Sequence, residues 1–394
     1  MIVMEELYTF LKKNNGGYGA YLKAKTALAR EKKFLENVYI QLTPLCNLSC
    51  KMCYARIDKK ELINNGDTIM RFEDWRIYID SIAKMSTPNV TFTGGECTIH
   101  PDFEKIYSYA YEQGLSIKVM TNATYITDRI LELWKKMPPA IVSITVYGKS
   151  PDVYESLCNN KAACLQVYRN IDILIKANIN LRLKYTIVKE NIEELEETYN
   201  YFLAKGYTLS YDETLISFGE CSDDTVNQES VDSNKLDAIK LKLENVEQLL
   251  SAQDALEKRE KWIQRSIKRL KNQEIVEKGM MCSACRNVCH ITWKGFVTPC
   301  VTLQDYILDP RSIGFEECWN RLKAWGDEVP QLVECQNCLF YEKCTSCVAM
   351  HYNDTHEFGK PSPRLCWKCK HPEEAANIQQ EIEQRGLYSF SKGL

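Results

Sequence analysis

LTPLCNLSCKMCYAR, residues 42–56, overlaps the end of a β-like run at 38–43 and contains three cysteines. The thiols of Cys46, Cys50 and Cys53 fall within eight residues. A four-iron iron–sulfur cluster takes four ligands, so a loop that supplies three leaves one iron open to another molecule. We expect the chemistry of the protein at that open position. A zinc knuckle, or chance clustering in a cysteine-rich chain, is the alternative interpretation.

A second motif, VTFTGGECTIHP at 90–101, follows another β-like run. Its two glycines, Gly94 and Gly95, would let the backbone come close to a ligand. The carboxylate of Glu96 is suited to an ammonium group. Taken alone, the motif is weak evidence for a binding site.

Short β-like runs alternate with amphipathic helical patterns through the first half of the chain. Apolar side chains recur at three-and-four spacing in 75–82 and 192–202. Six such units predict an α/β fold with a parallel sheet. The carboxyl ends of its strands would bring together Cys46, Glu96, Thr121, Asn122 and Tyr147. The predicted strands are 38–43, 89–93, 116–120, 140–145, 180–188 and 207–211.

The composition favours an intracellular enzyme. The 394 residues are 45% hydrophobic and 26% charged, with a net charge of −3. This balance gives no global attraction to nucleic acid or to an anionic membrane. Neither a signal peptide nor a transmembrane run is recognisable, so we expect a cytoplasmic location and no membrane partner. In a reducing compartment, clustered cysteines indicate metal ligands rather than disulfides.

A long charged stretch at 213–280 predicts a helical connector. Leu236, Ile239 and Leu243 follow helical spacing on one face, and a second helix is expected around Ile263 and Ile267. A solvated connector is the favoured interpretation, with a partner-recognition surface as the alternative.

The last third of the chain carries a second series of cysteines. Structural zinc is one account of such a series, because two CxxC pairs can form a tetrahedral site. Iron–sulfur clusters are the other. The candidate ligands are Cys282, Cys285, Cys289, Cys300, Cys335, Cys338, Cys344, Cys347, Cys366 and Cys369. The isolated Cys97, Cys158, Cys164, Cys221 and Cys318 are expected to be ordinary cysteines.

The CxxxCxxC loop resembles that of the radical SAM superfamily, in which three cysteines hold a cluster whose open iron binds S-adenosylmethionine. Tyr54 after Cys53 matches the aromatic residue usual in that family, and Gly94, Gly95 and Glu96 resemble its GGE motif, which holds the methionine ammonium. The resemblance implies a partial (β/α)6 TIM barrel. It also implies that Thr121, Asn122, Ser143 and Thr145 line the ribose and carboxylate of the cofactor.

The C-terminal series resembles the SPASM extension of peptide-modifying radical SAM enzymes, which carries two auxiliary four-iron clusters. The resemblance implies a first cluster on Cys300, Cys347 and two of Cys282, Cys285 and Cys289. It implies a second on Cys335, Cys338 and Cys344 with Cys366 or Cys369. Cys344 and Cys347 are separated by two residues where the family usually has three, so the partition of ligands stays open.

The resemblance implies a radical SAM oxidoreductase with three 4Fe-4S clusters. The expected reaction is hydrogen abstraction from a ribosomally made peptide, followed by oxidative formation of a thioether or carbon–carbon crosslink. Val301, where sulfatase-maturing relatives have an acid after the cysteine, argues against formylglycine formation. The alternatives are a sulfatase-maturase-like enzyme, a small-molecule radical SAM dehydrogenase or epimerase, and a non-catalytic iron–sulfur scaffold or electron carrier.

The expected organisation has five parts. They are an N-terminal extension (1–37), the barrel (38–212), the connector (213–280), the SPASM domain (281–372) and a C-terminal helix or tail (373–394). Because little chain precedes the first strand, leader binding is expected to need a separate recognition protein. A flavodoxin- or ferredoxin-type reductant is the other expected partner.

Overall fold

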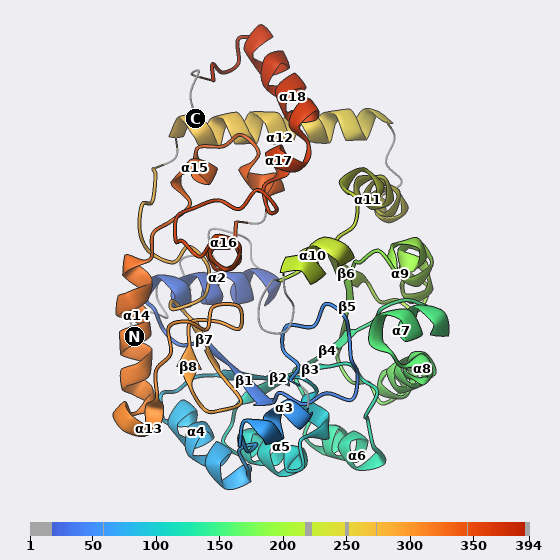
Figure 1. Ribbon diagram of the computed structural model, residues 1–394, viewed down its shortest axis with the longest axis vertical. Helices are drawn as coiled ribbons and strands as arrows, with labels where there is room; N and C mark the ends of the chain where they lie inside the picture. Colours follow the sequence, from blue (N-terminus) through green and yellow to red (C-terminus); the bar gives the residue numbers. More distant parts are fainter. Residues whose placement is uncertain are drawn as a thin grey trace.

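The computed structural model describes residues 18–57, 59–216, 223–248, 252–272, 274–344 and 346–390. Its centre is an eight-stranded sheet with the order β6-β5-β4-β3-β2-β1-β7-β8, in which β1 to β7 pair in parallel and β8 is antiparallel to β7 (Figure 1). The strands are β1 (Asn37–Thr43), β2 (Asn89–Gly94), β3 (Ser116–Thr121), β4 (Ile141–Thr145), β5 (Leu181–Thr186), β6 (Leu209–Asp212), β7 (Val288–Ile291) and β8 (Val297–Thr298).

The six strands predicted from sequence are all present, with small differences at their ends. The largest concerns β5, which ends at Thr186 instead of running to Val188. The side chain of Asn191 accepts from the Val188 amide (2.9 Å) and donates to the Thr186 carbonyl (2.9 Å). These two hydrogen bonds turn the chain away from the sheet, which periodicity alone does not reveal.

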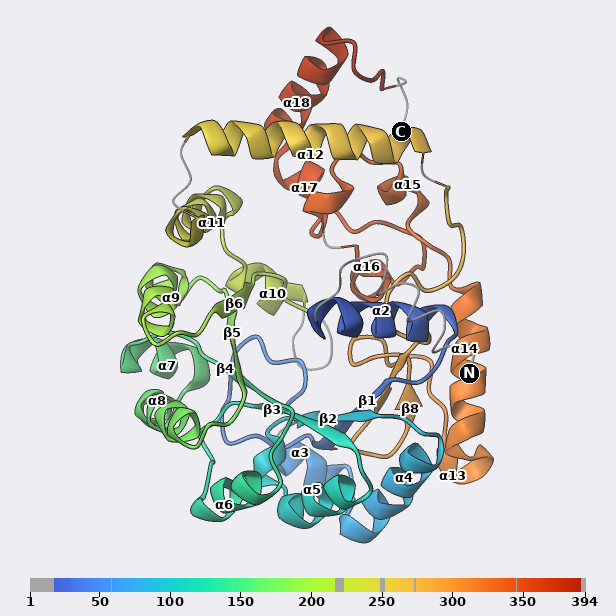
Figure 2. The same cartoon turned by 180° about the vertical axis from the view of Figure 1, so that it is seen from behind.

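Helices cover the outer side of the sheet (Figures 1 and 2). Trp75, Tyr78, Ile79 and Ile82 of α4 are all buried, as their spacing predicts. The helices are α2 (Tyr18–Glu31), α3 (Lys59–Asn64), α4 (Phe72–Lys84), α5 (Phe103–Glu112), α6 (Asp128–Lys136), α7 (Pro151–Cys158), α8 (Lys161–Lys176), α9 (Leu195–Leu203), α10 (Asp223–Glu229), α11 (Ser233–Gln248), α12 (Ala252–Asn272), α13 (Pro310–Ile313), α14 (Phe315–Glu328), α15 (Val333–Gln336), α16 (Val348–Thr355), α17 (Trp367–Lys370) and α18 (Pro372–Gln384).

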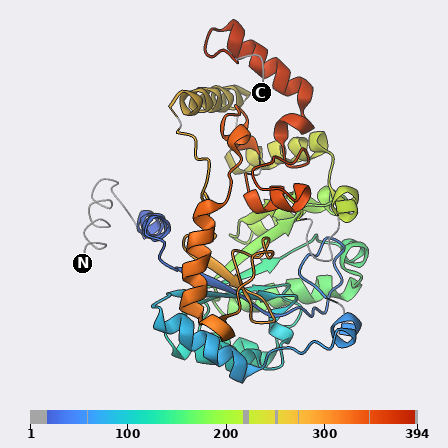
Figure 3. The ribbon, with the colours of Figure 1, turned by 60° about the vertical axis from the view of Figure 1, so that its left-hand side comes forward.

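The cysteine-rich C-terminal region contributes to the same sheet. β7 pairs in parallel with β1 over four residues, from Asn37↔Val288 to Ile40↔Ile291. The Tyr78 hydroxyl on α4 also donates to the Gly295 carbonyl in the β7–β8 turn (2.9 Å). α14 stands along this edge of the sheet (Figure 3). The barrel strands and the start of the C-terminal region therefore share one hydrogen-bonded sheet.

The predicted connector forms α11 and α12, and its second helix belongs to a separate small core. Ile263 and Ile267 of α12 are buried against Ile378 and Ile382 of α18. These two helices cross at one end of the molecule (Figures 1 and 2). Along the described part of the chain, none of the helices has the length and apolar character needed to cross a membrane.

A chain that ends at Gly279 should aggregate or lose its cooperative unfolding transition. Removing β7 would leave β1 as an open edge, and unpaired strand edges promote association. Size-exclusion chromatography and thermal unfolding by circular dichroism, with the full chain as reference, test this. A monomeric truncated protein with an unchanged transition would show that the barrel folds independently of the C-terminal region.

Candidate active site

The three-cysteine loop follows β1 and is held from two sides. The Ser49 amide donates to the Cys158 carbonyl (3.1 Å), and the Lys51 amide donates to the Leu157 carbonyl (3.1 Å) at the end of α7. The pKa of Cys46 is raised to about 12, mainly by burial and with smaller contributions from Glu96, Cys50 and Cys53. The three thiols thus lie close enough to influence one another, as the sequence predicted.

Gly94 and Gly95 make room for protein backbone. A Cβ on Gly94 would lie 2.3 Å from the Thr43 carbonyl oxygen, and a Cβ on Gly95 would lie 2.3 Å from that of Leu45. At this close approach, the Gly95 amide donates to the Thr43 carbonyl (2.8 Å) and the Glu96 amide to the Leu45 carbonyl (2.8 Å). The sequence suggested that these glycines admit a ligand; in the structure they admit the start of the cysteine loop.

The Glu96 carboxylate is fully buried and is hydrogen-bonded within the protein. Oε1 accepts from the Thr98 amide (3.0 Å), the Thr98 hydroxyl (2.7 Å) and the Thr121 hydroxyl (2.8 Å). Oε2 accepts from the Asn122 amide (2.6 Å). Burial raises the pKa of Glu96, while these hydrogen bonds act to lower it. The carboxylate therefore links the ends of β2 and β3.

Asn122 extends this link to the cysteine loop. Its Nδ2 donates to Asn47 Oδ1 (3.0 Å) and lies 3.6 Å from Cys46 Sγ. Asn47 in turn donates to the Thr124 hydroxyl (2.7 Å). Glu96, Thr121 and Asn122, which were singled out from sequence, thus form one continuous network beside Cys46.

Ser143 and Thr145 occupy alternate positions of β4 and share one face of the strand. Their register partners on β5 are Arg182 and Lys184. Tyr54, after the last loop cysteine, has a pKa raised to about 12 by burial and then by Cys53 and Cys300. Tyr54 is therefore near both Cys53 of the loop and Cys300 of the C-terminal region.

Cys158 is a neighbour of the loop, which corrects its assignment as an ordinary isolated cysteine. Its Sγ lies 3.6 Å from Cys50 Sγ, although the two residues are 108 positions apart. The hydrogen bond from Cys158 is the largest cause that lowers the pKa of Cys50, and Tyr147 contributes a second hydrogen bond. No local pattern marks Cys158, because its position depends on how α7 packs against the loop.

The other cysteines that we expected to be ordinary are buried side chains where the structure describes them. Cys97 is fully buried and contacts the Met120 carbonyl. Cys164 and Cys318 are also buried. Cys221 lies outside the described residues.

A set of basic side chains was missed from sequence. Lys118 on β3 and Arg182 and Lys184 on β5 have no ion pair among the described residues. Burial lowers the pKa of Lys118 and of Lys184, and Arg182 lowers both further. The signal was available in LRLKYT, where basic residues alternate with apolar ones and must share one face of the strand.

The C-terminal cysteines fall into two groups of thiols. In the first, Cys285 is influenced most by Cys300, then by Cys282 and Cys289, all of which raise its pKa. Cys347 raises the pKa of Cys300, and Cys282 raises that of Cys347. Cys282 and Cys300 are thus near each other, and both are near Cys285 and Cys347.

Cys289 takes a different position. It lies on β7 in register with Val38 of β1, and it is fully buried. The thiol that raises its pKa, after the effect of burial, is Cys318 of α14. Successive side chains of a strand point to opposite faces, so Cys289 and His290 lie on opposite faces of β7.

The second group comprises Cys335, Cys338, Cys344 and Cys366. After burial, Cys344, Cys366 and Cys338 raise the pKa of Cys335 to about 12. The Trp367 amide lies 3.1 Å from Cys344 Sγ. Cys369 is exposed and adjoins Cys366. Among the described residues, no three His, Cys, Asp or Glu side chains converge closely enough to hold one metal ion. These thiols are neighbours rather than a closed coordination shell.

Residues 40–202 match the sequence model of the Radical SAM superfamily. An AdoMet-dependent heme synthase of Methanosarcina barkeri is 23% identical over 83% of this chain and 95% of its own length. The antilisterial bacteriocin subtilosin biosynthesis protein AlbA of Bacillus subtilis is 25% identical over 40% of this chain and 34% of its own length.

Two solved structures share the fold. Streptococcus suis SuiB superposes with a TM-score of 0.59 at 14% identity, covering 86% of this chain and 79% of its own. anSMEcpe with bound AdoMet superposes with a TM-score of 0.60 at 15% identity, covering 89% of this chain and 98% of its own. At such identities the likeness extends to the fold and not to the reaction.

Gly95→Ala should lower the thermal stability and reduce the iron bound by the three-cysteine loop by about four atoms. The added methyl group overlaps the Leu45 carbonyl, and overpacking of this kind costs about 1–3 kcal/mol. Thermal unfolding and iron analysis after anaerobic reconstitution measure both effects. Gly206→Ala is the control, because its left-handed backbone is strained but its Cβ would meet nothing within 4 Å. Full iron content and unchanged stability in Gly95→Ala would contradict the steric argument.

Cys158→Ala should make the reduction potential of the cluster expected on Cys46, Cys50 and Cys53 more negative. A hydrogen bond to a ligand sulfur stabilises the reduced, more negative state, so losing the donor disfavours reduction. A tenfold change in the reduction equilibrium corresponds to ~59 mV for one electron. A redox titration followed by EPR measures the shift.

The matched control is Cys164→Ala, since that buried sulfur contacts the Lys149 carbonyl instead of a loop cysteine. An unchanged reduction potential in Cys158→Ala would show that the contact between Cys158 and Cys50 does not affect the cluster. Loss of iron in that variant would show that Cys158 acts as a ligand.

Proposed function

Because residues 40–202 match the sequence model of the Radical SAM superfamily, we propose that this protein is a radical S-adenosylmethionine enzyme that oxidatively crosslinks a ribosomally synthesised peptide. The observation that carries the proposal is the three-thiol loop, fixed by hydrogen bonds to Gly95 and Glu96. Three neighbouring thiols can hold a cluster and leave one iron open. A pure electron carrier would gain nothing from that open position.

Cys46, Cys50 and Cys53 would hold the cluster through their thiolates. When bound, a reduced 4Fe-4S cluster supplies the electron that splits S-adenosylmethionine into methionine and a 5′-deoxyadenosyl radical. The residues around it have separate tasks. Glu96 fixes the loops after β2 and β3, and Asn122 orients the loop beside Cys46. Ser143 and Thr145 are proposed to contact the cofactor from β4.

Two four-thiol sets are proposed as auxiliary cluster sites. The first is Cys282, Cys285, Cys300 and Cys347. Cys289 also influences Cys285, but the thiol that influences Cys289 itself is Cys318, so we leave Cys289 out of this set. The second is Cys335, Cys338, Cys344 and Cys366, with Cys369 at its exposed border. Sets of four thiols suit four-iron clusters. Clusters there would take up the electron that the substrate loses on oxidation. Tyr54, which is near Cys53 and Cys300, is the side chain that both sites have in common.

A peptide substrate is supported by the relatives. SuiB has been crystallised with its precursor peptide SuiA, and anSMEcpe with the peptide Kp18Cys. AlbA is named for the biosynthesis of the bacteriocin subtilosin. Val301 directly follows Cys300, which disfavours formylglycine formation as the reaction. A separate leader-recognition protein and a flavodoxin- or ferredoxin-type reductant are the proposed partners.

A tetrapyrrole is the second candidate substrate, and alignment coverage favours it. The Methanosarcina barkeri heme synthase aligns over 95% of its length, whereas AlbA aligns over 34%. The unpaired Lys118, Arg182 and Lys184 of the sheet are compatible with either choice, because peptides and tetrapyrroles both carry carboxylates.

Anaerobically reconstituted protein should bind about twelve irons, four for each of three clusters. It should release 5′-deoxyadenosine when S-adenosylmethionine and dithionite are added. The triple variant Cys46→Ala, Cys50→Ala, Cys53→Ala should lose about four irons and all cleavage. Absence of 5′-deoxyadenosine from the iron-loaded wild-type protein would overturn the radical assignment. About four irons together with stoichiometric zinc would overturn the auxiliary clusters.

The substrate is tested with two parallel incubations. One contains a short cysteine-rich peptide encoded beside the gene, and the other contains iron coproporphyrin III. Loss of two hydrogen atoms from the peptide, found by mass spectrometry, supports crosslinking. A change in the absorption and mass of the porphyrin alone would replace the peptide by a tetrapyrrole.

A further inference from the structure

A cavity of about 490 Å³ opens where the barrel meets the C-terminal region. Four parts of the chain line it: the segment after β6, the segment from the end of α10 to α11, Lys343, and the segment around α17. None of the expected site residues lines it. The lining is unusually basic, and the charges in it do not balance.

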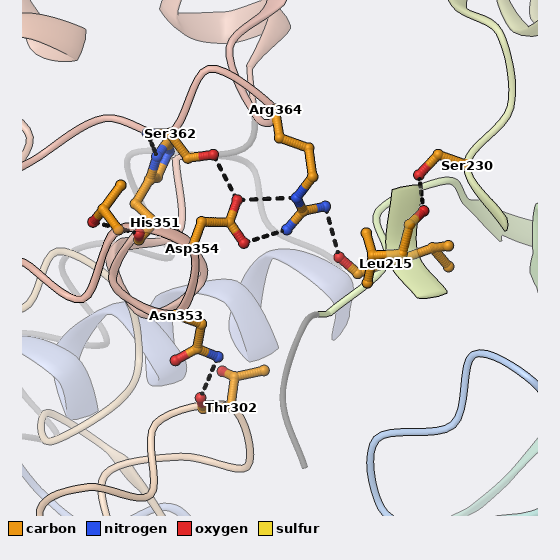
Figure 4. A network of polar contacts seen from close by, with 10 residues as sticks. Leu215, Ser230, Thr302, His351, Asn353, Asp354, Ser362 and Arg364 are labelled. Atoms are coloured by element: carbon orange, nitrogen blue, oxygen red, sulfur yellow. Dashed lines mark hydrogen bonds and ion pairs between the residues drawn. The ribbon is translucent and has the colours of Figure 1, made fainter. Parts of the chain in front are cut away.

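Arg364 is one of these cations, and it is fully used in joining the two regions (Figure 4). Its guanidinium donates to both carboxylate oxygens of Asp354 (3.0 and 2.7 Å) and to the Leu215 carbonyl (3.1 Å). Asp354 also accepts from the Ser362 hydroxyl (2.5 Å). Arg364 thus forms a fixed wall between the end of the barrel and the C-terminal region, with its charge neutralised.

Lys240 is neutralised in a similar way by an ion pair with Glu213. Lys343 and Lys370 differ, since no carboxylate in the described parts of the chain lies within salt-bridge distance of either ammonium group. Asp237 is the remaining acid of the lining, and it lies 3.8 Å from His371 Nε2. Two ammonium groups of the lining therefore have no carboxylate within salt-bridge distance among the described residues.

The side chains of Lys343 and Lys370 are exposed, and both line the cavity. An anion that enters the cavity from solvent can therefore reach both ammonium groups. Each contact would be a charge-assisted hydrogen bond.

The cavity also has an aromatic wall. Trp367 is stacked on His371, with ring centroids 4.7 Å apart, and on Phe340 at 4.8 Å. Lys343 Nζ lies 4.2 Å from the centroid of the Trp367 ring. A ligand here would meet a flat apolar surface beside two positive charges.

We propose that this cavity binds a carboxylate-bearing ligand, with Lys343 and Lys370 as its charge partners and Trp367 as its apolar wall. The carboxylates can come from acidic side chains of a peptide or from a free polycarboxylate such as a tetrapyrrole. The site adjoins the second cysteine group, because Lys343 precedes Cys344 and Trp367 follows Cys366. Binding there does not depend on the radical reaction.

Isothermal titration calorimetry on the reconstituted full chain tests the proposal with three probes: citrate, a glutamate-rich peptide, and iron coproporphyrin III. A glutamine version of the peptide is the uncharged control. At least one carboxylate probe should bind the wild type, and added salt should weaken it. The double variant Lys343→Gln, Lys370→Gln should lose about tenfold or more in affinity, equivalent to about 1.4 kcal/mol, because it removes both charge-assisted contacts.

Lys368→Gln is the matched control, since this exposed lysine of α17 does not line the cavity. The pair Lys343→Arg, Lys370→Arg should retain binding, and unfolding temperatures verify that each variant is folded. Preference for the peptide identifies a chain segment as the occupant, and preference for the porphyrin identifies a small polycarboxylate. Failure of all three probes to bind wild type, or equal losses in the double variant and Lys368→Gln, would overturn the proposal. Release of 5′-deoxyadenosine without any probe reports separately on the proposed function.

Discussion

The close contact between Gly94–Gly95 and the backbone of Thr43 and Leu45 is the constraint on which the site depends. No Cβ fits at either glycine, so the end of β2 can approach the start of the cysteine loop closely enough for two amide hydrogen bonds. The same turn directs Glu96 into the interior. A buried carboxylate is costly unless its oxygens are hydrogen-bonded. The donors that satisfy it, from Thr98, Thr121 and Asn122, fix the end of β3 in turn.

The C-terminal region is positioned by a comparable constraint at the other edge of β1. Because β7 pairs with β1, the thiols near β7 are placed relative to the three-cysteine loop by strand hydrogen bonds instead of by a linker. Tyr54 beside Cys53 and Cys300 is one result. The Arg364 link to the Leu215 carbonyl performs the same task at the far end of the barrel. Fixed separations of this kind suit electron transfer, where distance matters.

Local sequence patterns were sufficient to predict the strands and the buried faces of the helices. The period of two in β5 and the spacing of Trp75, Tyr78, Ile79 and Ile82 in α4 follow from which face of each element is buried. They also placed Glu96, Thr121 and Asn122 at one edge of the sheet, because parallel strands end together. A pattern of glycines shows that something approaches closely but not what, and the structure shows that the backbone of Thr43 and Leu45 approaches Gly94 and Gly95.

The sequence by itself determined the alternating strands and helices, the three-cysteine loop with its GGE partner, and the existence of a second cysteine series. These depend on residue type and spacing along the chain. The tertiary structure alone decided that Cys158 contacts Cys50, that Cys289 lies near Cys318 as well as near Cys285, and that Lys343 and Lys370 face a cavity without a carboxylate within salt-bridge distance. Such contacts join residues that the order of strands and the packing of helices bring together, and no spacing in the sequence encodes them.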